Sequence, residues 1–378
     1  MLEAFRTERL NFPIFKEKIQ LSSCSQSAMH VSVKEAVNDY FRTWEVNGMD
    51  WKGWMQACEN ARLSFAKMIN ADKKEVAIVS SVSHAASSIA TSLIKNNRKK
   101  ILVTELDFPT IGHVWQSHRD SFDVTFIKGK ENDWIDKEDY NTMLDENTLL
   151  VSTSHVSYYD GYKQHLKEIA DVVHHKGAYL FVDAYQSFGQ CEIDVKKMNI
   201  DMLATGLQKY ALGIPGIAFL YIKNEIAQSL TPKITGWFGQ RNPFLFDIRN
   251  TDYADSTVRF DTGTFPMVNG FAAEAALKVL NKFSMDEVEK RLQYLSGIAI
   301  EEADKRGLQV KSPRDLERKG SNTAILVNNA SEAESRLLKQ NIILSARNDV
   351  LRIAPHFYNT EEEVITAVEA VADFTTNL

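Results

Sequence analysis

Polar residues that could do chemistry follow directly after short apolar runs at four places in the chain. These places are residues 81–84, 107–110, 183–186 and 205–209. In an open α/β sheet, ligands bind beyond the carboxyl ends of the strands. If the apolar runs are strands of one sheet, the four segments meet at one edge and form a candidate site.

Asp183 and Lys209 are the two residues in these segments with the clearest chemistry. Asp183 follows the apolar run AYLFV, so we expect a partly desolvated carboxylate that needs a cationic or hydrogen-bonding partner. Lys209 follows DMLATG, and an amine held in such a place can have a depressed pKa and form a Schiff base. Taken alone, the aspartate could be a helix cap or turn residue and the lysine a solvated side chain. Together, on successive predicted strands, they match the lysine and acidic partner that hold pyridoxal phosphate.

The elements that would position these residues alternate along the middle of the chain. The predicted strands are EVAIVSS, KKILVTEL, FDVTFIKG, TLLVSTSHVS, AYLFVDAY, DMLATG and IAFLYI. Helical patterns lie between several of them, namely HAASSIATSLIKN, the region around HVWQSHRD, and KEIADVVHHKG. Short, nearly continuous apolar strands between helices predict a wound α/β domain whose mostly parallel sheet is covered on both faces.

The pattern changes after about residue 250. Two helical stretches, NGFAAEAALKVLNKF and MDEVEKRLQYLSGIAIEEADKRG, precede short strands at AILVNN and VLRIAPH and a final amphipathic helix. We therefore predict a large α/β domain over residues 20–250 and a smaller α+β domain over residues 251–378. Residues 1–19 form a segment that could pack on the smaller domain.

Composition narrows the class of protein. Charged residues make up 25% and hydrophobic residues 44% of the 378 residues, which excludes a disordered, collagen-like or coiled-coil chain. The net charge of −6 gives no general footprint for nucleic acid or an acidic membrane. Cys24, Cys58 and Cys191 are too few and too scattered for a disulfide framework or a zinc site. With only strand-sized apolar runs, the sequence predicts a soluble cytoplasmic protein without a metal.

The stretch FVDAYQSFGQCEIDVKKMNIDMLATGLQKYALGIPGIAFLYI resembles the signature of the class V aminotransferases. These are fold-type I pyridoxal-phosphate enzymes that include cysteine desulfurases, kynureninases and isopenicillin N epimerase-like enzymes. Further matches occur in order along most of the chain: LSSCSQS, SSVSHAAS, TELDFPT, SHVSYYDGY, ITGWFGQRNPF, RFDTGTF and RIAPHFYNTEEEV. The resemblance implies a homodimer that acts on an α-amino acid through an external aldimine and a quinonoid.

The resemblance also implies roles for individual residues. Lys209 would carry the cofactor and later shuttle the α-proton, and Asp183 would keep the pyridine nitrogen protonated. The other implied cofactor-binding residues are Ser83 and His84 at a helix start, Phe108 against the ring, Tyr158 and Gln186 near the cofactor oxygen, Gln208 at the phosphate, and Thr264, which would reach the phosphate of the neighbouring subunit. Without the resemblance, Ser83 and His84 would be an ordinary N-cap and Phe108 a core aromatic.

Two further residues are implied to bind the substrate. Arg352, in VLRIAPHFYNT, would hold the carboxylate, since a guanidinium can make two parallel hydrogen bonds to one carboxylate. The alternative is a surface ion pair. Trp237, in ITGWFGQ, would line the substrate pocket, although this segment could equally be a packed turn.

The departures from the family pattern decide what reaction to expect. Cysteine desulfurases need a mobile nucleophilic cysteine shortly before the carboxylate-binding arginine, and residues 345–352 contain none. Neither Cys24 nor Cys58 nor Cys191 lies near that position, so we expect an aminotransferase or lyase rather than a typical cysteine desulfurase. A kynureninase-like hydrolase, an amino acid epimerase and a non-catalytic pyridoxal-phosphate-binding homologue remain as alternatives. A dinucleotide-dependent oxidoreductase is disfavoured because no G-x-G-x-x-G follows the early strands.

Overall fold

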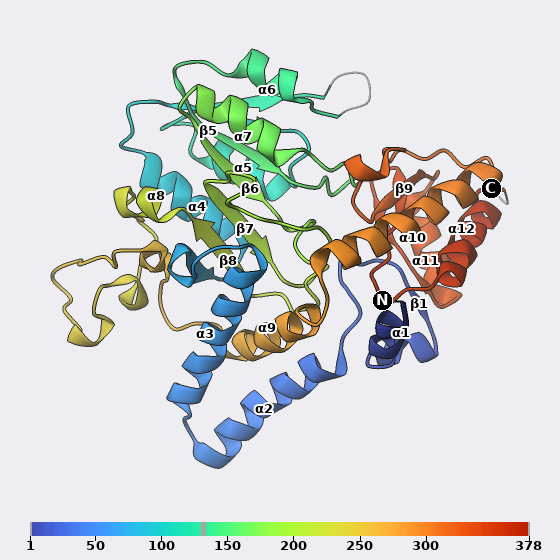
Figure 1. Ribbon diagram of the computed structural model, residues 1–378, viewed down its shortest axis with the longest axis horizontal. Coiled ribbons are helices and arrows are strands. Elements are labelled where there is room, and N and C mark those ends of the chain that lie inside the picture. Colours follow the sequence, from blue (N-terminus) through green and yellow to red (C-terminus); the bar gives the residue numbers. More distant parts are fainter. Residues whose placement is uncertain (1, 130–133, 377–378) are drawn as a thin grey trace.

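A seven-stranded sheet forms the centre of the computed structural model, which describes residues 2–129 and 134–376 (Figure 1). The strands lie in the order β2-β8-β7-β6-β5-β3-β4. Their bounds are β2 Val76–Val79, β3 Lys100–Thr104, β4 Asp123–Ile127, β5 Thr148–Ser154, β6 Tyr179–Asp183, β7 Met202–Gly206 and β8 Ala218–Ile222. Only β8 runs antiparallel to its two neighbours in this sheet. The predicted mostly parallel sheet is therefore confirmed.

Helices cover both faces of this sheet. One face packs against α4 (Val82–Leu93), α5 (Pro109–Ser117) and α8 (Asn224–Ser229). The other packs against α3 (Trp51–Met68), α6 (Lys137–Met143), α7 (Leu166–His175) and α9 (Met267–Leu280). Alternation along β3 shows the division, because Ile101 and Val103 join the first core and Leu102 joins the second.

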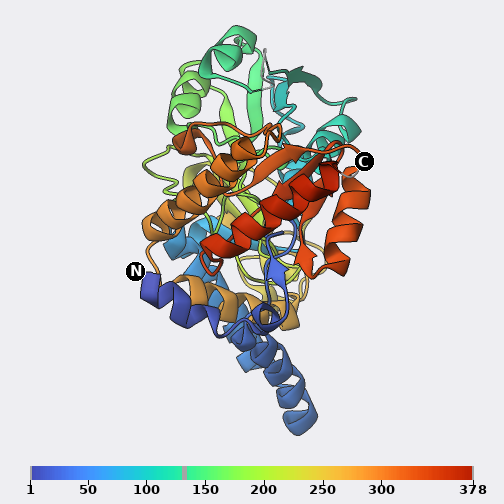
Figure 2. The ribbon, with the colours of Figure 1, turned by 90° about the vertical axis from the view of Figure 1, so that its right-hand side faces the viewer.

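A second, smaller unit lies beside the large sheet, on the right of Figure 1. Its antiparallel sheet has the order β11-β12-β9, and its apolar core is separate from the two cores of the large sheet. Its strands are β9 Thr323–Leu326, β11 Ser345–Arg347 and β12 Val350–Ile353, and its helices are α10 Met285–Lys305, α11 Ala330–Lys339 and α12 Glu361–Thr376. Figure 2 shows α10 and α12 side by side over this unit.

The N-terminal residues reach both units. The short β1 (Ile19–Gln20) pairs in parallel with β10 (Ile342–Ile343) of the smaller unit. In contrast, α2 (Val31–Asn47) and α3 pack against α9, whose apolar residues belong to the core of the large sheet. The domain boundary at residue 250 stays a prediction, and the ends of the predicted ranges, residues 1, 377 and 378, lie outside the described residues. The 3-10 helices are Pro13–Lys16, Lys73–Glu75, Trp237–Gly239, Pro243–Leu245, Thr257–Phe260 and Leu316–Arg318.

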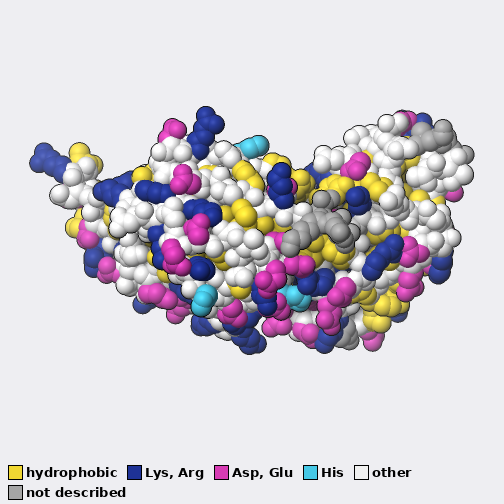
Figure 3. Space-filling model, turned by 90° about the horizontal axis from the view of Figure 1, so that it is seen from above, with side chains coloured by type: hydrophobic (Ala, Val, Ile, Leu, Met, Phe, Trp, Pro, Cys, Tyr) yellow, Lys and Arg dark blue, Asp and Glu magenta, His cyan; other side chains and the backbone are white. Residues whose placement is uncertain are grey.

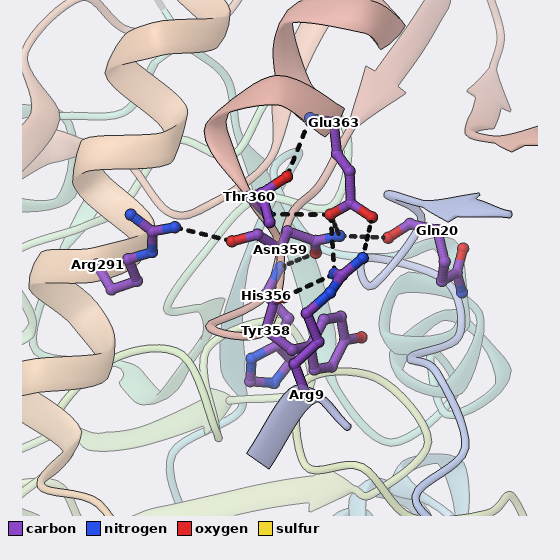
Figure 4. A network of polar contacts seen from close by, with 8 residues as sticks. All are labelled: Arg9, Gln20, Arg291, His356, Tyr358, Asn359, Thr360 and Glu363. Atoms are coloured by element: carbon purple, nitrogen blue, oxygen red, sulfur yellow. Dashed lines mark hydrogen bonds and ion pairs between the residues drawn. The ribbon is translucent and has the colours of Figure 1, made fainter. Parts of the chain in front are cut away.

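A polar network fixes α1 (Leu2–Arg9) to the smaller unit (Figure 4). Arg9 makes two hydrogen bonds to the carboxylate of Glu363, of 2.7 and 3.0 Å, and a third to the Tyr358 carbonyl, of 2.8 Å. Asn359 donates to Glu363 and to the Gln20 carbonyl, both at 3.0 Å. Bidentate arginine–carboxylate pairs are geometrically specific. The network therefore holds the loop that follows β12 in a defined position.

No helix of residues 2–129 and 134–376 is long and apolar enough to cross a membrane. Basic and acidic side chains are interspersed over the face seen in Figure 3. Within residues 2–129 and 134–376, no three His, Cys, Asp or Glu side chains gather in a way that could hold a metal ion.

A buried ion pair connects the segment before Thr264 to the large sheet. Arg62 of α3 donates to Asp261 at 2.6 Å, and both side chains are almost completely buried. Asp261 also accepts from the backbone N–H of Ile78 in β2, and Arg62 donates to the carbonyl of Val76. Arg62 also pairs with the partly exposed Glu59 at 3.0 Å, whereas Asp261 has Arg62 as its cation, so removal of Arg62 leaves an uncompensated buried charge.

Arg62→Ala should lower the free energy of unfolding by about 3–5 kcal/mol, because Asp261 would stay buried without its cation. Urea denaturation followed by circular dichroism measures the change. Arg42→Ala is the matched control, since Arg42 pairs with Asp39 on the surface and such pairs contribute about 0–1 kcal/mol. Equal changes in the two variants would contradict the assigned role of the buried pair.

Candidate active site

The amine of Lys209 lies between two aromatic rings at the carboxyl edge of the large sheet. Lys209 follows the end of β7 by three residues, and its Nζ is 4.4 Å from the ring centroid of Tyr185. The ring of Phe108, at the start of α5, lies 5.7 Å from the same atom. Three of the strand-end segments predicted from the sequence, those of Phe108, Tyr185 and Lys209, therefore meet at this edge.

Asp183 ends the neighbouring strand β6, and its carboxylate is 94% out of contact with solvent. Its Oδ1 accepts from the Tyr185 amide at 2.8 Å, while Oδ2 makes no hydrogen bond within the described part of the chain. Burial raises the pKa of Asp183, and the Tyr185 amide and the charge of Lys209 oppose that rise. An acceptor oxygen is thus held ready for a cationic N–H.

Burial has the opposite effect on Lys209. It lowers the pKa of the amine to about 8, against the attraction of Asp183, and the positive charges of Arg352 and Arg347 lower it further. An amine with such a pKa is partly unprotonated near neutral pH, which is the form that attacks a carbonyl. The pair can therefore hold an aldehyde cofactor through Lys209 and a protonated ring nitrogen through Asp183.

Tyr185 was not predicted from the sequence as a site residue. Its ring occupies space that exists because residue 206 is a glycine: a Cβ atom there would lie 2.4 Å from the Tyr185 ring. The sequence signal that could have identified it is the glycine that ends β7, because β7 neighbours the strand that ends two residues before Tyr185.

The glutamines predicted to bind the cofactor contact the N-terminal segment. Gln186 is buried and donates to the Cys24 carbonyl at 3.0 Å, and Gln208 donates weakly to the Ser25 carbonyl at 3.4 Å. The backbone of Gln208 in turn accepts from the Ser27 amide. The segment around LSSCSQS is therefore held against the residues that flank Asp183 and Lys209.

The predicted phosphate site is the start of α4, with one change in detail. Ser81 is the N-cap, since its Oγ accepts from the His84 amide at 3.1 Å, so Ser83 lies inside the first turn. The first intrahelical bond runs from Ala85 to Ser81 at 3.1 Å, so the amides of residues 82 and 83 have no partner within the helix. His84 Nε2 is buried and lacks a hydrogen bond within the described residues. These donors at a helix N-terminus fit a phosphate group.

Arg352 is completely buried rather than part of a surface ion pair, so that alternative is wrong. Its guanidinium donates to the Tyr158 carbonyl at 2.7 Å, to Ser25 Oγ at 2.9 Å, and to Ser345 Oγ and carbonyl at 2.8 and 3.2 Å. All of these acceptors are neutral, and no carboxylate of the described residues pairs with the charge. A buried cation without an anion is a receptor for an anionic group, since pairing removes an unfavourable charge.

Three other predicted residues differ in their surroundings. The ring of Tyr158 packs edge-on against Phe108, with centroids 5.1 Å apart. Thr264 is exposed. Trp237 stacks on Phe238 at 4.1 Å and makes no described contact with Lys209. The roles of Thr264 and Trp237 stay predictions.

Cys24 lies closer to Arg352 in the structure than its position along the sequence indicated. Cys24 is far from residues 345–352 along the chain, but its neighbour Ser25 contacts both Ser345 and Arg352. The sulfur itself is buried against Tyr210 and Ala354, with 1% of the residue exposed. A cysteine therefore does lie near the predicted carboxylate-binding arginine, in a packed position.

Asp107 brings a second carboxyl group to the site. It follows β3, accepts from Thr104 Oγ1 at 3.1 Å, and leaves Oδ1 buried without a partner in the described residues. Burial, together with the negative charge of Asp183, raises its pKa well above the usual range. The negative charge at this edge is therefore carried more readily by Asp183 than by Asp107.

The fold and these side chains define an enzyme of the fold-type I pyridoxal-phosphate class. The family model "Aminotransferase class-V" matches residues 20–366. A relative in Bacillus subtilis (strain 168), "Uncharacterized aminotransferase YcbU", is 41% identical over 361 residues, which cover 96% of this chain and 95% of the relative. The chain therefore belongs to the class V aminotransferase family, and the predicted family and its cofactor, pyridoxal phosphate, are confirmed.

Solved structures confirm the predicted fold. A cysteine desulfurase from Thermococcus onnurineus NA1 superposes with a TM-score of 0.89 at 22% identity, and the alignment covers 98% of each chain. A mutant of C-DES with glycine covalently linked to its pyridoxal-phosphate cofactor gives a TM-score of 0.88 at 20% identity, covering 97% of this chain and 99% of that one. At this identity the likeness concerns the fold.

The amine of Lys209 should titrate far below an exposed lysine in protein freed of cofactor. Acetylation measured at a series of pH values, with peptides quantified by mass spectrometry, should give a midpoint near pH 8 for Lys209. Lys305 is the internal control, because Glu302 raises its pKa on the surface. Asp183→Asn should move the Lys209 midpoint to lower pH, since the carboxylate favours the charged amine. A midpoint that stays or rises in this variant would show that Asp183 does not act on Lys209.

Proposed function

We propose that this protein is a pyridoxal-phosphate-dependent aminotransferase of α-amino acids, with Lys209 as the residue that carries the cofactor. The observation that supports this most directly is the Lys209 amine, with its pKa near 8, beside the ring of Tyr185 and next to the strand that ends at Asp183. The name of the 41% identical relative also supports transfer of an amino group.

When bound, pyridoxal phosphate supplies a protonated aromatic ring that withdraws electrons from the substrate's α-carbon. Asp183 Oδ2 would accept the hydrogen bond of the ring nitrogen and hold its proton. Phe108 would pack against the ring and exclude water from that face. The first turn of α4, with Ser83 and His84, would donate hydrogen bonds to the phosphate, and Gln208 would lie close to the same group.

Two residues handle the substrate. Arg352 binds the α-carboxylate, which takes the place of the serine hydroxyls as acceptor for the guanidinium. Lys209, once its amine is free, removes the proton from the α-carbon and returns it at another atom, which is the work of a general base and acid with a pKa near the working pH. The carboxylate contact orients the bond that breaks.

The strand connection before Arg352 disfavours cysteine desulfuration. Desulfurases need a mobile cysteine there, but β11 and β12 are joined by the two residues Asn348 and Asp349 in a tight hairpin. Asn348 adopts a φ of +50°, as such turns require, and Tyr159 donates to Asp349 at 2.6 Å. Neither the sequence nor the length of this connection provides a mobile thiol.

Borohydride reduction of the purified holoenzyme should attach a pyridoxyl group to Lys209, identified by peptide mass spectrometry. Lys209→Ala should lose the label and lower kcat by about 10²- to 10⁴-fold, the usual contribution of a general acid–base. Lys305→Ala changes a surface residue and should keep both the label on Lys209 and the kcat of the wild type. Each amino acid is then incubated with the holoenzyme, in the presence and in the absence of an added keto acid, and the products are analysed. Aminotransfer gives a new keto acid and a new amino acid without ammonia.

Other products would replace the proposed reaction by one of its alternatives. Ammonia or sulfide with pyruvate would identify a lyase, alanine with an aromatic acid a kynureninase-like hydrolase, and the opposite enantiomer an epimerase. A labelled protein whose absorption no amino acid changes would be a non-catalytic cofactor-binding homologue.

Incubation with L-cysteine should leave no persulfide on the protein, because the only cysteine near Arg352 is packed against Tyr210 and Ala354. Burial also raises the pKa of the Cys58 thiol to about 12, which keeps it protonated. Intact-mass measurement under non-reducing conditions detects the added sulfur. Persulfide that disappears in Cys24→Ser would restore the desulfurase assignment.

We also propose a cytoplasmic homodimer with shared active sites. Thr264 can serve a phosphate only if a second copy approaches its exposed side. Large apolar side chains are exposed on α2 and in the segment after Trp237, namely Phe41, Trp44, Phe244, Leu245, Phe246 and Ile248. Exposed apolar groups of this size are typical of surfaces that pack against another chain.

A further inference from the structure

Arg347 is a second arginine on the face of the smaller sheet that carries Arg352. In the β11–β12 hairpin, Ser345 pairs with Arg352 and Arg347 pairs with Val350. Residues that are directly paired, or two apart on one strand, share a face of the sheet. The opposite face carries Ala346 and Leu351, which belong to the core of the smaller unit. Arg347 therefore lies on the face that Arg352 turns toward the large domain.

Arg347 forms no ion pair with an acidic side chain of the described residues, and the negative charge of Glu334 in α11 acts on it without direct contact. Its guanidinium makes one hydrogen bond, from Nη1 to the Ala346 carbonyl at 2.8 Å, and it forms no ion pair within residues 2–129 and 134–376. The carboxylate of the adjacent Asp349 is used by the Tyr159 hydroxyl. Arg347 is half-buried, and burial together with the charge of Arg352 lowers its pKa. Two like charges thus share one partly desolvated region.

The charges of the site do not balance for a substrate with a single carboxylate. Asp183 is assigned to the ring nitrogen, and burial together with the charge of Asp183 raises the pKa of Asp107, which disfavours a second negative charge there. The α-carboxylate of the substrate can neutralise Arg352, and Arg347 then remains without an anion. Holding an unpaired cation beside another cation costs free energy that an anionic ligand would recover.

We propose that the substrate is an acidic α-amino acid, whose side-chain oxyanion is bound by Arg347 while Arg352 holds the α-carboxylate. This inference rests on the proposed function, because it assumes that an amino acid binds at Lys209. The guanidinium suits a carboxylate or another oxyanion, since it offers a planar pair of N–H donors. The short hairpin turn holds Arg347 at a fixed distance from Arg352, so the two charges select the separation of the two acidic groups.

The test compares acidic amino acids with their neutral amides on the holoenzyme. L-glutamate is paired with L-glutamine and L-aspartate with L-asparagine, because each pair differs little in shape but by one charge. Titration of the cofactor absorption gives an apparent Kd for each. The wild type should bind the better acid at least 10-fold more tightly than its amide. Arg347→Gln should weaken the acid by about 10- to 100-fold, the loss of a charged hydrogen-bonded pair, and leave the amide within about twofold.

Three variants separate this role from general damage. Arg347→Lys keeps the charge and should keep part of the preference for the acid, even if the glutamine variant is unstable. Arg336→Gln, on the exposed face of α11, is the matched control and should change neither Kd. Arg352→Gln should weaken the acid and its amide equally, because both carry the α-carboxylate.

Several results would overturn the proposal. Equal affinity of the wild type for an acid and its amide would contradict it. An equal loss of affinity for both in Arg347→Gln would assign Arg347 to the α-carboxylate. A lower affinity for pyridoxal phosphate in Arg347→Gln, with unchanged discrimination, would assign it to the cofactor phosphate. If neutral amino acids change the absorption and acidic ones do not, the proposed function survives and this inference fails. If no amino acid changes it, both fail.

Discussion

The buried guanidinium of Arg352 is the contact on which the arrangement of the site depends. It joins three parts of the chain that are far apart in sequence: Ser25 in the N-terminal segment, the carbonyl of Tyr158 after β5, and Ser345 in the smaller unit. A cation that is 99% buried is tolerated only where its N–H groups are satisfied, so these three segments must keep their relative positions. The Arg9–Glu363 network then fixes the loop that follows Arg352 on the other side.

Burial shifts the pKa values of the acidic and the basic groups of the site in opposite directions. It raises the pKa values of Asp183 and Asp107 and lowers that of Lys209, because each loses solvation of its charged form. Asp107 gains the larger rise since it also faces the charge of Asp183. The result is two carboxyl groups with raised pKa values close to an amine whose pKa is lowered to about 8, which is a combination typical of catalytic sites.

The sequence predicted the strand ends, the mostly parallel sheet and the family, because each rests on local patterns. Apolar runs of four to seven residues predict buried strands, and the residues that follow parallel strands then lie at one edge of the sheet. What it missed depends on contacts between distant segments. Tyr185 packs in the space left by Gly206, and Cys24 reaches the neighbourhood of Arg352 only because β1 pairs with β10. Spacing along the chain carries no information on either approach.

The position of Arg347 was not predicted, although a local signal for it exists in the sequence. Asn348 and Asp349 form a two-residue turn, and such a turn fixes the register of the strands on either side. The register places residues 345, 347, 350 and 352 on one face, so two arginines must share it. A longer connection would let residue 347 move away from Arg352 and relieve the repulsion. The short turn removes that freedom, and an anion bound by both arginines would relieve the repulsion.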